Sequence, residues 1–348
     1  MAARKKKAAQ AKKNVAKKKA AVKAPAVRKA RGRIDLHHHF LPQDYMRAEK
    51  ERSSATHGNT DLFSWTPEKS IAEMDKAGIA FAFASTSTPG VWYGDVELGR
   101  RLARQWTDAA VEAIGQYPGR FGLFAPLPLP DTDGSLAQIE YALDEVGADG
   151  LGLLANFEGK WLGDQSFWPV MEELNRRKSL VYVHPTFSPC CTNNMVPGLV
   201  APSLEFPFDT VRTIVSLVTS GTTTKFPDIR FIFSHGGGAI TGIYGRIERM
   251  ANMPAFKGKF TDMHAELQKL YYDTASLSAE VTLPALLKMI PPTHLLLGSD
   301  YPLAGPPPVN VMVQRARQEF EDMHPSPKLM QMVEHDNAVR LVPRIAKI

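Results

Sequence analysis

The chain has 348 residues, of which 44% are hydrophobic and 22% charged, a composition that permits one large α/β barrel or two medium domains. It contains no apolar run of about 18 residues, which argues against a membrane span. Its two cysteines, Cys190 and Cys191, are adjacent and provide no disulfide framework, so we expect a reducing, cytoplasmic setting.

The charge is distributed unevenly along the chain. The formal net charge is +6, yet residues 1–33 hold fourteen Lys and Arg residues and no acid, which leaves 28 basic residues against 36 acidic ones in the remainder. The Ala- and Lys-rich segment 1–32 cannot bury enough apolar surface to order itself, and it lacks the apolar core of a signal peptide. We interpret it as a solvated tail. An arm that binds nucleic acid through phosphate neutralisation is the less favoured interpretation.

From residue 33 onward, short apolar runs alternate with amphipathic stretches. The first predicted helix, at 65–77, has Thr66 as its N-cap and Pro67 in its first turn, and Gly78 ends it. The predicted strands are 33–37, 79–85, 121–127, 150–154, 180–184, 230–235, 270–274 and 294–300. The other predicted helices are 96–116, 134–146, 167–177, 208–220, 279–290, 309–323 and 327–342.

This alternation indicates the fold class. The strands are nearly continuous apolar runs, as expected for parallel strands that are buried on both faces. Eight of them separated by helices predict a (β/α)8 barrel of the TIM type over residues 33–348. A doubly wound open sheet is the alternative, but no Gly-rich dinucleotide loop follows the first strand.

Several predicted strands end in a side chain that can bind a metal ion. The carboxyl ends of barrel strands converge on one face, so residues distant in sequence can meet there. Alternation along the first strand directs His37 and His39 to one side and His38 to the other. Imidazoles with one carboxylate suit zinc, and also manganese or iron. The strand-end residues are His37, His38 and His39 on the first strand, His184 on the fifth, His235 on the sixth and Asp300 on the eighth.

A single histidine in such a position carries little information. A strand or helix histidine is usually packed or exposed without a function, and we interpret His57, His264, His294, His324 and His335 in this way. A His-x-His pair joined by His, His and Asp at three other strand ends is much harder to obtain by chance. The combination therefore predicts a metal centre.

Five short segments are spread over the chain after residue 33: DLHHHFLP at 35–42, VHP at 183–185, EFPFDT at 205–210, SHGGG at 234–238 and GSDYP at 298–302. In this order they resemble the amidohydrolase superfamily, and the resemblance extends over nearly everything after residue 33. More specifically, they resemble the branch that contains aminocarboxymuconate-semialdehyde decarboxylase and 6-methylsalicylate decarboxylase.

The resemblance implies a role for each matching residue. His37, His39, His184 and Asp300 match ligands of one divalent ion, for which we expect zinc, with manganese as the alternative. His235 matches a histidine that works in acid–base chemistry, a role that Asp300 could share. Arg246 matches an arginine that crosses a dimer interface to bind the substrate carboxylate, so we expect a homodimer. An arginine in a salt bridge on a helix surface is the alternative for Arg246.

The expected function is non-oxidative decarboxylation that releases CO2 from a small aromatic or unsaturated acid similar to 6-methylsalicylate. Asp61 stands where the semialdehyde decarboxylase has a substrate-binding arginine, which weakens the case for a dicarboxylate substrate. The segment STSTPG at 85–90 resembles the methylsalicylate branch more closely. One alternative is a hydrolase that opens a lactone or amide with metal-activated water. Another is an inactive barrel that binds nucleic acid with its tail, which the intact ligand set argues against.

Overall fold

The computed structural model describes residues 32–43, 45–46, 65–191, 196–251, 253–254, 262–278, 280–303, 318, 320–322 and 325–347. They belong to one compact unit that starts at Gly32. Residues 1–31 of the predicted tail, together with His57, Asp61, His324 and most of the helix predicted at 309–323, lie outside the described residues. In the part that is described, every helix is too short or too polar to cross a membrane.

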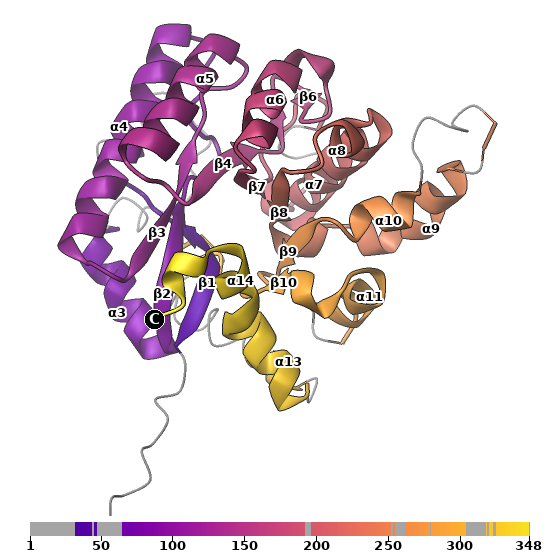
Figure 1. The fold of residues 1–348 in the computed structure, drawn as a ribbon. Coiled ribbons are helices and arrows are strands. Elements are labelled where there is room, and N and C mark those ends of the chain that lie inside the picture. Colours follow the sequence, from indigo (N-terminus) through magenta and orange to yellow (C-terminus); the bar gives the residue numbers. More distant parts are fainter. Residues whose placement is uncertain are drawn as a thin grey trace, which may run out of the picture. The chain divides into compact units, whose positions relative to one another are not determined.

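Eight parallel strands form the centre of this unit (Figure 1). Hydrogen bonds also join the first strand to the segment directly after the last one, because the amide of Leu36 donates to Leu297 O at 2.9 Å and that of His39 to Tyr301 O at 2.7 Å. The sheet therefore closes into the predicted TIM-type barrel, and the open sheet is excluded. In spatial order the strands are β1 (Arg33–His39), β2 (Ile79–Ser85), β3 (Phe121–Pro126), β4 (Gly150–Leu154), β7 (Leu180–His184), β8 (Arg230–Phe233), β9 (Tyr271–Asp273) and β10 (Leu295–Leu296).

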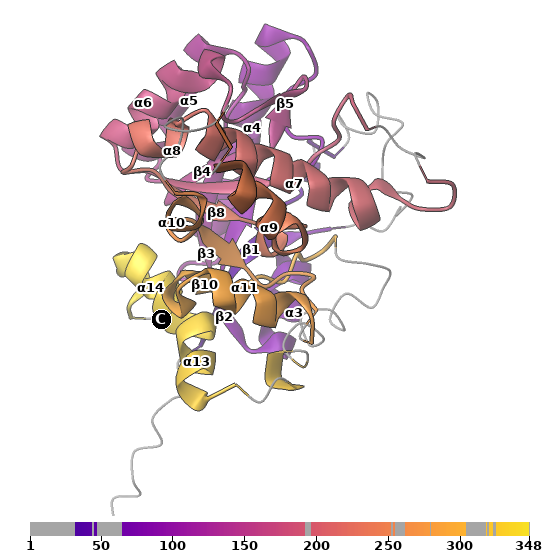
Figure 2. The same ribbon diagram turned by 90° about the vertical axis from the view of Figure 1, so that its right-hand side faces the viewer.

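Helices surround the strands, and α4 (Val96–Gln116), α5 (Thr132–Glu140) and α6 (Trp168–Arg176) form one side of this outer layer (Figures 1 and 2). A small antiparallel hairpin, β5 (Asn156–Phe157) and β6 (Lys160–Trp161), follows β4. The helices are α3 (Pro67–Ala77), α4 (Val96–Gln116), α5 (Thr132–Glu140), α6 (Trp168–Arg176), α7 (Ala201–Thr219), α8 (Thr222–Lys225), α9 (Ile240–Ala251), α10 (Met263–Leu267), α11 (Thr282–Met289), α13 (Pro327–Gln331) and α14 (Asn337–Leu341).

Local chemistry explains where the first helices begin and end. The Thr66 side chain accepts a hydrogen bond from the amide of Lys69, and Gly78 ends α3 with a φ of 66°. Asp95 caps α4 in the same way, because its carboxylate accepts from the amide of Leu98 at 2.8 Å. Such caps satisfy amide groups that have no partner inside the helix. The caps predicted for α3 are thereby confirmed.

The barrel interior is a packed apolar core. The rings of Phe83 and Phe124 stack with centroids 4.9 Å apart, and Phe124 stacks on Tyr182 at 5.4 Å. Leu341 of α14 belongs to the same buried cluster. A larger cluster, which includes Trp106 of α4, fills the space between strands and helices. Because the interior is apolar, polar side chains from the strands gather at their carboxyl ends.

Candidate metal centre

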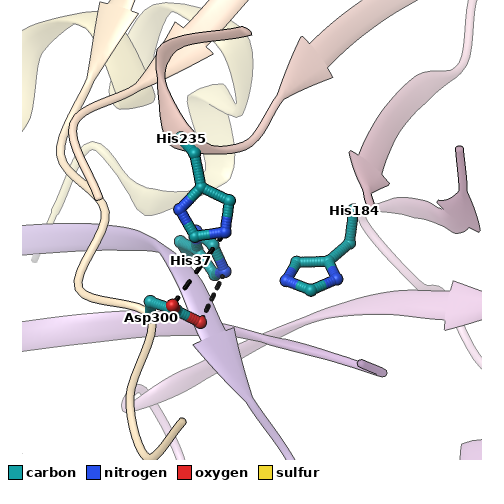
Figure 3. Close-up of side chains that lie close together, drawn as sticks. All are labelled: His37, His184, His235 and Asp300. Carbon is teal, nitrogen blue, oxygen red and sulfur yellow. Dashed lines mark ion pairs between the residues drawn. The ribbon is translucent and has the colours of Figure 1, made fainter. Parts of the chain in front are cut away.

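Side chains from four strand ends meet at this face of the barrel (Figure 3). His37, His184, His235 and Asp300 each offer one ligand atom, and these atoms all lie within 4.8 Å of one another. His39 joins them, since its Nε2 lies 3.1 Å from His37 Nε2 and 3.1 Å from Asp300 Oδ1. The structure therefore brings together five of the six residues that sequence reasoning singled out.

The donor atoms have the spacing that a metal ion requires. His37 Nε2, His39 Nε2 and Asp300 Oδ1 form a triangle whose three sides are 3.1 Å long. Two ligands about 2.1 Å from one ion, at about a right angle, are about 3 Å apart. His37 and His39 are fully buried, so water cannot satisfy their lone pairs. The residues present thus fit a divalent ion, and their nitrogen and oxygen atoms suit zinc or manganese.

An irregularity in β1 aims its histidines. The pairing of β1 with β2 shifts register between Asp35 and His38. Leu36 packs in the interior core with Tyr182, and the next ring, His37, also contacts Tyr182, at a centroid distance of 5.4 Å. Two consecutive side chains therefore point into the barrel, as a β-bulge permits. The predicted alternation from His37 onward is preserved.

Asp35 fixes this strand end from the outer side. Its Oδ1 accepts hydrogen bonds from the amides of His37 and Ser299, both at 3.0 Å, which ties β1 to the segment after β10. Its Oδ2 lies 3.2 Å from His38 Nδ1, and the other ring nitrogen of His38 contacts Ser70 of α3. His38 thus points away from the candidate metal centre and anchors β1 to α3.

Asp273 at the end of β9 supports the cluster, and sequence reasoning missed it. Its Oδ2 lies 2.9 Å from His37 Nδ1 and accepts a hydrogen bond from Tyr182 Oη at 3.0 Å. Its Oδ1 accepts from the amide of His235 at 2.9 Å. A carboxylate on the second ring nitrogen orients a metal-ligating histidine and raises its basicity. The signal was available, because Asp273 also stands at a strand end.

The protonation states of three histidines suit metal binding. Burial lowers the pKa of His39 to about 4, although Asp300 opposes the shift. Burial also lowers the pKa of His184 well below its ordinary value, and that of His235 by less. All three imidazoles are therefore neutral at pH 7 and keep a lone pair for a cation or a proton.

His37 and Asp300 have the opposite character. Burial disfavours the imidazolium of His37, but the carboxylates of Asp273 and Asp300 outweigh it and raise the pKa of His37 to about 10. Burial alone would raise the pKa of Asp300, yet the nearby His37 charge and hydrogen bonds with His37 and His39 lower it well below its usual value. The metal-free cluster therefore holds one proton on His37 beside the Asp300 carboxylate, and a metal ion would displace that proton.

Two residues of the cluster have left-handed backbones. His235 has a φ of 54° and Asp300 a φ of 60°, a conformation that non-glycine residues rarely adopt. Such a conformation costs about 1–3 kcal/mol and occurs often at functional sites. Gly236, which follows His235, also has a φ of 60°. These turns aim the His235 and Asp300 side chains at the shared centre.

Gly298 offers a test of the cluster's packing. A Cβ atom at this position would lie 2.8 Å from Asp273 Cγ and 2.9 Å from His37 Cβ. The Gly298→Ala variant should therefore separate the two residues and weaken metal affinity about 10- to 100-fold, as measured by titration of the metal-free protein. Gly115→Ala is the matched control, because its Cβ would meet nothing within 4 Å. Unchanged affinity in Gly298→Ala would contradict this packing.

The remaining predicted residues lie away from the cluster. Arg246 is exposed on α9 and is not part of the cluster in the single chain. His264 lies on α10, and its Nδ1 is 2.9 Å from Tyr244 Oη. His294 precedes β10 at the opposite end of the barrel, and its ring stacks on Tyr271 with centroids 4.0 Å apart.

Comparison with known proteins places the chain in a family. The amidohydrolase family model matches residues 34–344. The chain belongs to the amidohydrolase family. A decarboxylase of Aspergillus niger, yanB, is 33% identical over 90% of this chain and 88% of its own length. The 6-methylsalicylic acid decarboxylase acuB of Aspergillus aculeatus is 32% identical over 90% of this chain and 97% of its own length.

A solved structure has the same architecture. A crystal structure described as an amidohydrolase II superimposes with a TM-score of 0.79 at 28% identity, covering 89% of this chain and 99% of its own. The fold and the family predicted from the sequence motifs are both confirmed.

Proposed function

We propose that this amidohydrolase is a metal-dependent decarboxylase that releases CO2 from a small aromatic carboxylic acid similar to 6-methylsalicylate. The observation that carries the proposal is the cluster of imidazoles around Asp300 at the barrel mouth. It occurs in a chain that resembles decarboxylases over about nine-tenths of its length. No specific observation favours the hydrolase alternative.

His37, His39, His184 and Asp300 would hold the ion, with Asp273 orienting His37. We predict zinc from the donor set, with manganese as the alternative. A solved dihydroxybenzoic acid decarboxylase from Polaromonas has the same fold at 22% identity and a TM-score of 0.74, and its bound ion is manganese. Metal analysis of the purified protein distinguishes the two ions.

A bound ion would orient the substrate carboxylate with its neighbouring hydroxyl and stabilise negative charge. The chain must then deliver a proton to the ring carbon that carries the carboxylate, after which the C–C bond breaks and CO2 leaves. Burial lowers the pKa of His235, so the resting imidazole is neutral and must first accept a proton from the substrate or from solvent. Its imidazolium is then a stronger acid than an ordinary one and gives this proton up readily. Asp300 is the weaker candidate for this step, because its carboxylate resists protonation. We assign the proton transfer to His235.

We further propose that the chain forms a homodimer in which Arg246 of one protomer binds the substrate carboxylate in its partner. Two facts support this assignment. Arg246 is exposed on α9, and among the described residues it forms no hydrogen bond or ion pair with the candidate metal centre of its own chain. A sizing measurement with light scattering tests the dimer. Arg246→Ala should raise KM much more than it lowers kcat if the arginine acts on substrate binding.

Metal binding should release a proton. His37 has a pKa of about 10 without metal, and a ligand imidazole must be neutral, so each ion that binds at neutral pH displaces one proton. Because higher pH removes the competing proton, affinity should rise about tenfold per pH unit from about pH 7 to 9. Calorimetric titration in two buffers with different ionisation enthalpies counts the protons released. A proton count near zero would contradict this charge assignment.

The function itself is tested by supplying the metal-loaded protein with hydroxybenzoic acids and with lactones. The proposal predicts CO2 release from a salicylate-type acid and no base consumption with the lactones. Base consumption without CO2 release would instead support a hydrolase. A variant that lacks residues 1–32 should retain its turnover, whereas a protein that functions through its basic tail would lose its partner.

A further inference from the structure

The loop after β7 carries both cysteines of the chain at the rim of the barrel. The amide of Cys191 donates to Ser188 O at 3.0 Å, which closes a tight turn. This turn places Cys190 Sγ 2.9 Å from Cys191 Sγ. Cys190 is exposed and Cys191 is half-buried, so solvent reaches one thiol of the pair more easily than the other.

A chain of hydrogen bonds gives the two thiols different roles. Arg212 Nη2 on α7 donates to Cys191 Sγ at 3.3 Å. Cys191 is thereby an acceptor on one side, and its own S–H is available to Cys190, whose sulfur also lies 3.3 Å from Ser188 Oγ. A thiol has a single weak donor. Either sulfur can be the donor of this contact, and we assign the S–H to Cys191, which leaves Cys190 as the acceptor.

The pKa shifts of the two thiols agree with this assignment of donor and acceptor. The hydrogen bond from Cys191 lowers the pKa of the Cys190 thiol, with a smaller contribution from Ser188. The same bond raises the pKa of Cys191, and burial and Glu205 add to that shift, whereas the charge of Arg212 opposes it. Arg212 Nη1 is buried and has no hydrogen-bond partner among the described residues. The positive charge of Arg212 also lowers the pKa of Cys190, and Asp209 opposes this effect.

We propose that Cys190 is an oxidisable thiolate and Cys191 its resolving partner, so that a peroxide converts the pair into a reversible vicinal disulfide. Reactive sensor cysteines have these attributes: thiolate character, access to solvent and a second thiol within reach. The two adjacent sulfurs already face one another, so the second step needs only a local rearrangement of this loop.

The chemistry balances with hydrogen peroxide as oxidant. The Cys190 thiolate attacks one peroxide oxygen and the O–O bond breaks, which gives a sulfenic acid and hydroxide. The sulfur loses two electrons and the peroxide gains them. The Cys191 sulfur then attacks the Cys190 sulfur, the S–O bond breaks, and the leaving hydroxide takes the thiol proton to form water.

The adjacency of the two residues makes the product easy to reduce. Neighbouring Cα atoms are about 3.8 Å apart across a trans peptide, whereas relaxed disulfides join Cα atoms about 4.4–6.8 Å apart. A disulfide within this pair is therefore strained, and strained disulfides have higher reduction potentials. Such a bond serves a reversible modification better than a structural crosslink.

The test uses the full chain, in which every thiol signal comes from this pair. Limited hydrogen peroxide should remove both free thiols together and lower the intact mass by about 2 Da, and a dithiol reductant should restore them. In Cys191→Ser, the sulfenic acid has no resolving thiol, so dimedone should label Cys190. In the matched Cys190→Ser variant, labelling of Cys191 should be at least about tenfold slower.

Three outcomes would overturn the proposal: equal labelling of the two single variants, a disulfide between chains, or direct conversion of Cys190 to a sulfinic acid in the unaltered protein. Arg212→Gln, which removes the charge, should slow thiol loss, and an unchanged rate would also count against it. The readout is the state of the thiols alone. Failure of the decarboxylase proposal therefore leaves this one standing, and the reverse also holds.

Discussion

Replacement of His37 by alanine is expected to abolish stoichiometric metal binding and, with it, CO2 release. His37 Nε2 is one of the three donor atoms that lie 3.1 Å apart, and Asp273 Oδ2 orients the ring through its other nitrogen, Nδ1. Without its imidazole, the remaining donors would not surround an ion, and the Asp273 carboxylate would lose one of its partners. Elemental analysis after dialysis, with CO2 release measured on the same sample, checks both effects.

His294→Gln is the matched control for this experiment. His294 is a histidine of the same barrel but lies before β10, at the end opposite the cluster, where its Nδ1 is 3.1 Å from Leu270 O. This variant should keep its metal and its turnover. If His37→Ala kept one ion per chain with ordinary activity, the ligand assignment would be wrong.

Replacement of His235 by asparagine should leave the metal bound and lower kcat about 10²–10⁴-fold, the usual contribution of a positioned proton-transfer group. Asparagine is the appropriate substitution because it tolerates the left-handed backbone that His235 adopts, with φ at 54°. Single-turnover measurement of CO2 release, combined with metal analysis, separates the chemical step from ion loss.

The outcome also decides between two roles for His235. Its ligand atom lies within 4.8 Å of those of His37, His184 and Asp300, so these four residues together could hold a metal ion. Its Nε2 is nevertheless 3.9 Å from Asp300 Oδ2, longer than the 3.1 Å that separates His39 from Asp300. Loss of the ion in His235→Asn would make His235 a ligand and contradict its assignment to proton transfer.

Strand periodicity predicted most of the cluster. The two-residue repeat placed His37 and His39 on one side of β1, and the convergence of strand ends in a barrel brought Asp300 to them from 261 residues beyond His39. The register shift before His38 could not be predicted, because it depends on pairing with β2. Leu36 points into the barrel, so strict alternation would have pointed the next side chain, His37, out of it.

Element boundaries were harder to predict where tertiary contacts determine them. The helix expected at 208–220 begins at Ala201, because Pro207 lies inside α7 instead of ending it. The strand expected at 294–300 shortens to Leu295–Leu296. The residues after it bond to β1 in an irregular backbone that turns Asp300 toward the cluster. Both departures occur beside the functional face. There the contacts that position the candidate metal centre outweigh the secondary-structure preference of the local sequence.

Asp273 supports the candidate metal centre without being one of the expected metal ligands. It was not among the predicted site residues, yet it contacts His37, Tyr182 and the backbone of His235. A residue of this kind becomes evident only when the second nitrogen of each ligand histidine is followed to its partner. Its place at the end of a strand was the available signal.

Anomalous diffraction from crystals grown with manganese or zinc tests the central claim most directly. Data at the absorption edge should show one strong peak about 2.0–2.3 Å from the ligand nitrogens of His37, His39 and His184 and from an Asp300 oxygen. A peak elsewhere in the chain, or no peak at this end of the barrel in protein that still decarboxylates its substrate, would contradict the account.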